Sequence, residues 1–313
     1  DFLGAGIDVY MLQVAKDRHG VLRLGPNADF HEAALAGAKL VVAQLNTSII
    51  APLGAPLIDP GQIDVIVPSE LSNPLLPQAT PDPAAEAIGQ QVANLIEDGD
   101  CLQTGIGAIP AAILQRLQGK NDLGIHGGLI DDGGLGLIRS GNVNGSQKGI
   151  DRGLHVTGMA LGSAQLMEAL AEDERIVLRG ANHTHEVSAI RQLDRFVSVN
   201  SAVEVDLYGQ VNAEMAGGRQ ISGTGGSVDF MRAAKASKGG RSIVAMTATA
   251  RGGSISRIVN KVEMVTALRT DADIVVTEYG VARLKNLPNA ERAKALIAIA
   301  APQFRDELIE GMV

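Results

Sequence analysis

The chain has 313 residues, of which 45% are hydrophobic and 20% charged, so it can bury the core of one large or two ordinary domains. The net charge of −8 excludes a global positive field that would attract nucleic acid, and no apolar run approaches the roughly 20 residues that span a membrane. The single cysteine, Cys101, excludes an internal disulfide, which fits a reducing compartment. From charge, hydropathy and cysteine count together, we expect a cytoplasmic protein without a nucleic-acid or membrane partner.

The first part of the chain shows strands followed by a linker. It opens DFLGAGIDVYML without a methionine, and we expect an upstream part of the same domain to precede it. Apolar runs at residues 39–46 and 63–68 predict buried strands. Residues 72–83 are rich in proline and polar side chains, which favours a linker.

From residue 83 onward, helical patterns alternate with short apolar runs. The runs predict strands at residues 101–107, 123–126, 154–161, 175–180, 241–249 and 272–280. Helical spacing predicts helices at residues 83–100, 109–117, 163–173, 186–193 and 289–300. This alternation favours an α/β fold with a mainly parallel sheet covered by helices.

Residues 197–208 differ from the other predicted strands because polar and apolar residues alternate strictly. Such a period of two would place Asn200, Glu204 and Asp206 on one face of a single strand. That face is either solvated, on an edge or antiparallel strand, or it forms a polar wall of an active-site cleft.

The segment 222–242 has the strongest signal for ligand binding. It contains five glycines and carries Arg232, Lys235, Lys238 and Arg241 against a single acidic residue. Glycines let backbone N–H groups approach a ligand, and a helix N-terminus attracts anions. We therefore predict a site for a phosphorylated ligand, the alternative being a surface turn followed by a solvated basic helix.

Several long motifs resemble one enzyme family. These are VNSAVEVDLYGQVNAE, GTGGSVDFMRAAKASKGGRSI, SRIV, VVTEYGVARL and ERAKALIAIAAPQFRDEL, in that order. Together with LQTGIGAIPAAIL they are similar to the acetyl-CoA hydrolase/transferase family, which includes acetate, butyrate and 4-hydroxybutyrate CoA-transferases. A sugar-phosphate isomerase on a similar fold is disfavoured by the length of this motif set.

The resemblance implies two CoA-transferase-like open-sheet α/β domains with the active site in the cleft between them. Residues 1–85 would be the remainder of the N-terminal domain, incomplete at its N-terminus, and residues 86–313 the C-terminal domain. It further implies coenzyme A or an acyl-CoA as substrate together with a small carboxylate, no metal, and a homodimer or higher homo-oligomer.

The resemblance also implies roles for individual residues. The glycine loop would line the CoA site through Gly223, Gly225, Gly226, Asp229 and Phe230. A following turn would accompany it through Ser237, Lys238, Gly239 and Gly240. Asn182 becomes a candidate oxyanion donor to the thioester carbonyl, and Glu278 is expected near the active site.

The family's nucleophile is a glutamate in a stretch resembling GIHTEM, and here the stretch reads GIHGGL with Gly128 in the glutamate's place. Another carboxylate could replace it, such as Glu204, Glu278 or one upstream. Alternatively, Gly127 and Gly128 leave room for a water that His126 or a nearby carboxylate activates as general base. As a third possibility, the protein binds CoA esters without turning them over. His183 and His185 lie two residues apart, and for them we expect hydrogen bonding around a cleft rather than a metal.

Overall fold

The first part of the chain forms a four-stranded sheet in the order β2-β1-β3-β4. The computed structural model describes residues 6–77 and 79–312. β1 runs antiparallel to β2 and parallel to β3, and β3 is parallel to β4. The predicted strands at 39–46 and 63–68 are confirmed. The elements of this part are β1 (Ile7–Lys16), β2 (Leu22–Leu24), α1 (His31–Gly37), β3 (Ala38–Asn46), η2 (Pro60–Gln62) and β4 (Val65–Ser69).

The rest of the chain is built around an eight-stranded sheet in the order β19-β18-β14-β9-β5-β6-β7-β8. All neighbours in this sheet are parallel except β18 and β19. Its central strands are buried on both faces, which explains why most of them appear in the sequence as continuous apolar runs. The strands are β5 (Cys101–Thr104), β6 (Gly124–Ile130), β7 (His155–Ala160), β8 (Ile176–Leu178), β9 (Phe196–Asn200), β14 (Arg241–Ala245), β18 (Ile274–Thr277) and β19 (Gly280–Arg283).

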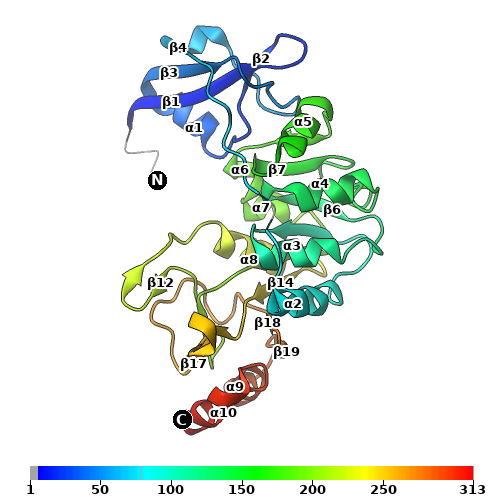
Figure 1. Cartoon of the computed structure of the whole chain (residues 1–313), viewed down its shortest axis with the longest axis vertical. Helices are drawn as coiled ribbons and strands as arrows, with labels where there is room; N and C mark the ends of the chain where they lie inside the picture. The colour runs from blue at the N-terminus through cyan, green and yellow to red at the C-terminus, as the bar shows by residue number, and fades with distance from the viewer. Residues whose placement is uncertain (1–5, 78, 313) are drawn as a thin grey trace.

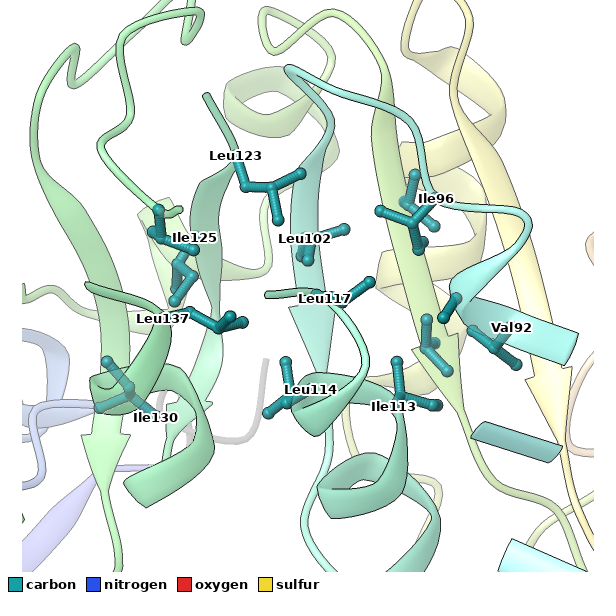
Figure 2. Close-up of a cluster of buried hydrophobic side chains, with 14 of the residues drawn as sticks. Val92, Ile96, Leu102, Ile113, Leu114, Leu117, Leu123, Ile125, Ile130 and Leu137 are labelled. Atoms are coloured by element: carbon teal, nitrogen blue, oxygen red, sulfur yellow. The ribbon is translucent and has the colours of Figure 1, made fainter. Parts of the chain in front are cut away.

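Helices cover this sheet and bury its largest hydrophobic cluster. Figure 2 shows Ile113 and Leu114 of α3 and Val92 of α2 gathered over Leu102 of β5. Burying each such side chain stabilises the fold by about 1.5–3 kcal/mol. The helices are α2 (Pro83–Ala93), α3 (Ala108–Gln115), α4 (Asp132–Arg139), α5 (Ala164–Glu172), α6 (Ala181–Thr184), α7 (Val187–Ile190), α8 (Ser227–Ala236), α9 (Asn289–Ala298) and α10 (Arg305–Glu310).

The prediction of one alternating strand at 197–208 is wrong. The chain leaves the large sheet after Asn200, and β10 pairs with β11 and β17 in a separate three-stranded sheet. Since β9 lies between β5 and β14, its Ser198 is buried as fully as the valines beside it. The short elements in this region are β10 (Glu204–Asp206), β11 (Val211–Asn212), β12 (Met215–Ala216), β13 (Arg219–Gln220), β15 (Thr249–Ala250), η3 (Arg251–Gly253), β16 (Ile255–Ser256), β17 (Ile258–Val259) and η4 (Pro302–Phe304).

The four-stranded sheet docks against the β7–β8 edge of the large sheet. The Ala28 amide donates to the Gly158 carbonyl at 2.8 Å, and the Leu178 amide donates to the Gly54 carbonyl at 2.9 Å. In Figure 1 this arrangement brings α1 close to α6 of the second part. The predicted linker forms neither helix nor strand in its described residues before Pro83, where α2 begins, and a domain boundary near residue 85 stays a prediction.

Within the described ranges, every helix is too short or too polar to cross a membrane.

Candidate active site

A cavity of about 540 Å³ lies where the two parts of the chain meet. This volume is within the range of small-molecule sites, about 300–1,000 Å³. One wall comes from the start of α1 and the turn before it, and the other from α6, the turn after α6 and the start of α8. The lining residues are Asp29, Phe30, Glu32, Ala33, Ala181, Asn182, His185, Glu186, Gly225, Gly226 and Asp229.

The glycine loop reaches this cavity through its second half. Gly225 has a φ of +55°, a left-handed conformation that side chains with a Cβ rarely adopt, and Gly226 caps the N-terminus of α8. The first amides of α8 therefore face the cavity with the positive end of the helix dipole. Of the loop residues expected at the CoA site, Gly225, Gly226 and Asp229 line the cavity, whereas Gly223 does not and Phe230 is buried behind it.

His185 is the imidazole of this cavity. Its ring packs on Phe230 with 4.5 Å between ring centroids, and its Nδ1 lies 2.8 Å from the Thr184 hydroxyl. Burial lowers the pKa of His185, against the opposing effect of the carboxylates of Asp29 and Asp229. The sequence interpretation gave this histidine only a hydrogen-bonding role.

Gly128 lies on β6 facing the His185 ring. A Cβ added at Gly128 would be 2.9 Å from both Cε1 and Nε2 of His185. A Cβ at Gly127 would instead meet Gln103. The space next to Gly128 is therefore filled by the imidazole, and the expectation that the two glycines leave room there for a water is wrong.

Asn182 lines the cavity as an exposed residue, and its Nδ2 donates to Glu32 Oε2 at 3.3 Å. This contact bridges the two walls. The amide is therefore placed where it could reach a ligand carbonyl, and its oxyanion role stays a prediction.

His126 lies behind the cavity and not in it. Its ring is fully buried, its Nε2 contacts the His183 carbonyl at 3.1 Å, and burial lowers its pKa to about 3. A general base must reach the proton that it abstracts, so the structure does not support His126 in that role.

His126, Asp151 and His183 form a cluster whose donor atoms lie within 4.8 Å of one another. His183 Nε2 bonds Asp151 Oδ2 at 2.7 Å, and the same carboxylate oxygen is 3.9 Å from His126 Nδ1. The ammonium of Lys148 is close enough to lower the pKa of His126, and its positive charge opposes a bound cation. The expectation that the histidines hydrogen-bond rather than bind a metal stays a prediction.

The two other candidate carboxylates lie outside the cavity. Glu204 Oε1 accepts from the Glu263 amide at 2.7 Å and from Asn212 Nδ2 at 3.0 Å. Glu278 Oε2 accepts from the Ala248 amide at 2.8 Å. Both carboxylates are thus engaged in holding loops, and the structure does not bring either to the cavity lining.

The turn formed by residues 237–240 lies at the opposite end of α8 from the glycine loop. Ten helical residues span about 15 Å, so Ser237, Lys238, Gly239 and Gly240 do not line the cavity. The Ser237 hydroxyl donates to the Leu193 carbonyl at 2.5 Å and accepts from the Phe196 amide at 3.0 Å. This turn therefore joins α8 to the loop before β9.

The basic residues of this segment also lie away from the cavity lining. Arg241 pairs with the buried Asp100, Arg232 lies 3.4 Å from Asp271, and Lys235 donates to the Thr270 carbonyl. The case for an anion site thus depends on the helix N-terminus and the glycines, and not on the basic side chains.

Acid should destabilise the protein through its buried histidines. Burial lowers the pKa of His126 to about 3 and that of His155 to about 4, both below the ordinary 6.5. Between pH 6.5 and the lowered pKa of each histidine, the unfolded chain binds a proton at that histidine and the folded chain does not. We expect the free energy of unfolding to fall below pH 6.5 by up to about 1.4 kcal/mol per pH unit for each histidine.

Urea unfolding of the protein and of His155→Asn between pH 7.5 and 4.5 measures this effect. The variant should lose less stability over that range than the unaltered chain does. Equal slopes in the two proteins would contradict the assignment of His155 as a buried neutral imidazole.

Comparison with known proteins places these features in a family. Residues 162–312 match the acetyl-CoA hydrolase/transferase C-terminal domain. The 4-hydroxybutyrate coenzyme A transferase of Clostridium kluyveri is 41% identical over 309 residues, which cover 97% of this chain and 72% of the relative. The chain belongs to the acetyl-CoA hydrolase/transferase family. The resemblance predicted from the motifs is confirmed.

Other members agree with this assignment in sequence and in fold. The butyryl-CoA:acetate CoA-transferase of Anaerostipes caccae is 37% identical over 97% of this chain and 71% of its own length. The crystal structure of RipA from Yersinia pestis superposes with a TM-score of 0.92 at 36% identity, covering 98% of this chain and 71% of that one. The predicted α/β CoA-transferase fold is therefore confirmed, and this acetyl-CoA hydrolase/transferase family member is an enzyme of acyl-CoA transfer or hydrolysis.

Proposed function

We propose that the 540 Å³ cavity holds the thioester end of a short-chain acyl-CoA. The observation that carries this proposal is that both parts of the chain line one cavity. The glycine loop and the start of α8 lie on one side, and residues 29–33 lie on the other. Family members are named for acyl-CoA substrates, and a cleft between the two parts of the chain is where such a ligand would be enclosed.

The lining residues divide the work of binding. The free amides at the start of α8 are suited to an anionic or carbonyl oxygen. Asn182 offers a neutral donor to the thioester carbonyl, and the exposed ring of Phe30 offers an apolar surface for a short acyl chain. The small-carboxylate acceptor of a transferase would have to enter the same cavity, past Asp29, Glu32 and Glu186.

Gly225→Val tests the loop. A β-branched side chain at a positive φ would push the backbone away from the cavity, so we expect the Kd for acetyl-CoA to rise about tenfold or more. Gly217→Val is the matched control because its φ of +59° is close to the +55° of Gly225, and an added Cβ meets nothing within 4 Å at either position. Gly217 lies in the β12–β13 turn and does not line the cavity.

Isothermal titration calorimetry with acetyl-CoA and butyryl-CoA, at matched protein stability, supplies the readout. Equal Kd values for the two variants would contradict the placement of the ligand. Thiol release assayed with and without acetate as acceptor then separates transfer from hydrolysis, and tight binding without any turnover would identify a CoA-ester-binding protein.

A further inference from the structure

The cavity presents one imidazole and four carboxylates, among the described residues, as groups that can move a proton. The carboxylates are Asp29, Glu32, Glu186 and Asp229. No cysteine, serine, threonine or lysine is among its lining residues. A base is most effective when its pKa is close to the working pH, which favours imidazole over a carboxylate for activating water near neutrality.

His185 lines the cavity, and its Nδ1 is the ring nitrogen that contacts Thr184, so Nε2 is the nitrogen available to act as a base. The Thr184 hydroxyl is fully buried and lies 3.3 Å from the Gly180 carbonyl, to which it can only donate. Its second neighbour is His185 Nδ1 at 2.8 Å. When the hydroxyl donates to the Gly180 carbonyl, Nδ1 carries the proton and Nε2 keeps its lone pair, whereas donation to Nδ1 gives the other tautomer.

Packing holds that nitrogen in one position. The Nε2–Cε1 edge lies against Gly128, where a Cβ would be only 2.9 Å away, and a Cβ at Gly226 would meet the ring more closely still. Phe230 supports one face of the ring. The imidazole thus occupies space that a side chain at residue 128 or 226 would otherwise fill.

We propose that His185 is the general base of a direct acyl-CoA hydrolysis, in which water replaces a protein nucleophile. The proposal rests on the proposed function, because it needs the thioester in this cavity. His185 Nε2 takes a proton from water, and the water oxygen bonds to the thioester carbonyl carbon. The C–S bond then breaks, the imidazolium returns the proton to the CoA thiolate, and the products are a carboxylic acid and CoA.

Charges around the ring set the pH dependence of this step. Burial lowers the pKa of His185, whereas Asp29 from the first part of the chain and Asp229 from α8 oppose that shift. Glu32 and Glu186 line the same cavity. Since the base works unprotonated, kcat/KM should rise with pH and level off above an apparent pKa below 6.5.

His185→Asn in the full-length protein tests the proposal, and His19→Asn is the matched control because His19 is exposed on the β1–β2 turn. With acetyl-CoA and butyryl-CoA as probes and no acceptor, we expect His185→Asn to lower kcat about 10²–10⁴-fold. Its Kd should stay within about threefold of the unaltered protein, and the rising limb of the pH profile should vanish. His19→Asn should keep kcat, Kd and the pH profile.

The outcomes separate this inference from the function beneath it. Failure of the unaltered protein to bind either thioester would refute the proposed function. If the unaltered protein binds the thioesters, two results would refute the role of His185 and leave the proposed function standing. These are an undiminished kcat in His185→Asn, or no hydrolysis by the unaltered protein. Borohydride trapping followed by peptide mass mapping adds a further check, since a modified Asp or Glu would show a covalent route instead.

Discussion

Gly128→Ala is expected to lower acyl-CoA turnover about 100-fold, because the added methyl group would lie 2.9 Å from Nε2 and Cε1 of His185. The ring cannot retreat freely, since Gly226 and Phe230 enclose its other sides and Thr184 holds Nδ1. A displacement of about 1 Å is enough to lose that much rate when a reacting group must be aligned.

Gly136→Ala is the control for this substitution. Gly136 is exposed in the middle of α4, and a Cβ there meets nothing within 4 Å. Alanine at an exposed helical position should raise the free energy of unfolding by about 0.5–1 kcal/mol and leave kcat unchanged. Turnover in Gly128→Ala equal to that of the control would show that the packing of His185 against β6 does not matter for catalysis.

Arg241→Met should cost about 3–5 kcal/mol of folding stability, the largest loss that we expect from a single charge. Asp100 is fully buried, pairs with Arg241, and accepts from the Glu97 amide at 2.7 Å. Removing the guanidinium leaves a buried carboxylate without a counter-charge, so no Coulombic attraction offsets the free-energy cost of its desolvation.

Two further variants make this prediction specific. Arg232→Met removes a side chain that is 53% exposed and 3.4 Å from Asp271, and it should cost less than about 1 kcal/mol. Adding Asp100→Asn to Arg241→Met should recover much of the loss, because the amide carries no charge. Urea denaturation at pH 7.5 measures all of them, and a small loss for Arg241→Met would mean that Asp100 is protonated in the folded chain.

Much of the large sheet could be predicted from sequence, since its strands are short apolar runs between helical patterns. The segment at 197–208 could not, because alternation alone does not say whether a strand lies at an edge or in the centre. β9 is central, and its Ser198 is small enough to be buried there. The break after Asn200 has no turn signal of glycine or proline in the sequence.

The candidate site was predicted unevenly for a related reason. The glycine loop was found because its chemistry is local, and Gly225, Gly226 and Asp229 do line the cavity. The turn at 237–240 was grouped with it because the two are close in sequence, although a whole helix separates them in space. His185 was passed over because its partners, Gly128 and Gly226, are distant in the chain.

The sequence by itself determined the family, the parallel α/β architecture and the absence of a side chain at residue 128. Composition, periodicity and motif order are properties of the chain itself, so they can be recognised without knowing any long-range contact. Only the tertiary structure decided which groups meet: it filled the space beside Gly128 with an imidazole and turned Glu204 and Glu278 to other hydrogen bonds. Gly128 of β6, His185 just after α6 and Phe230 of α8 come together through the packing of the sheet and its helices, and no pattern along the chain encodes that proximity.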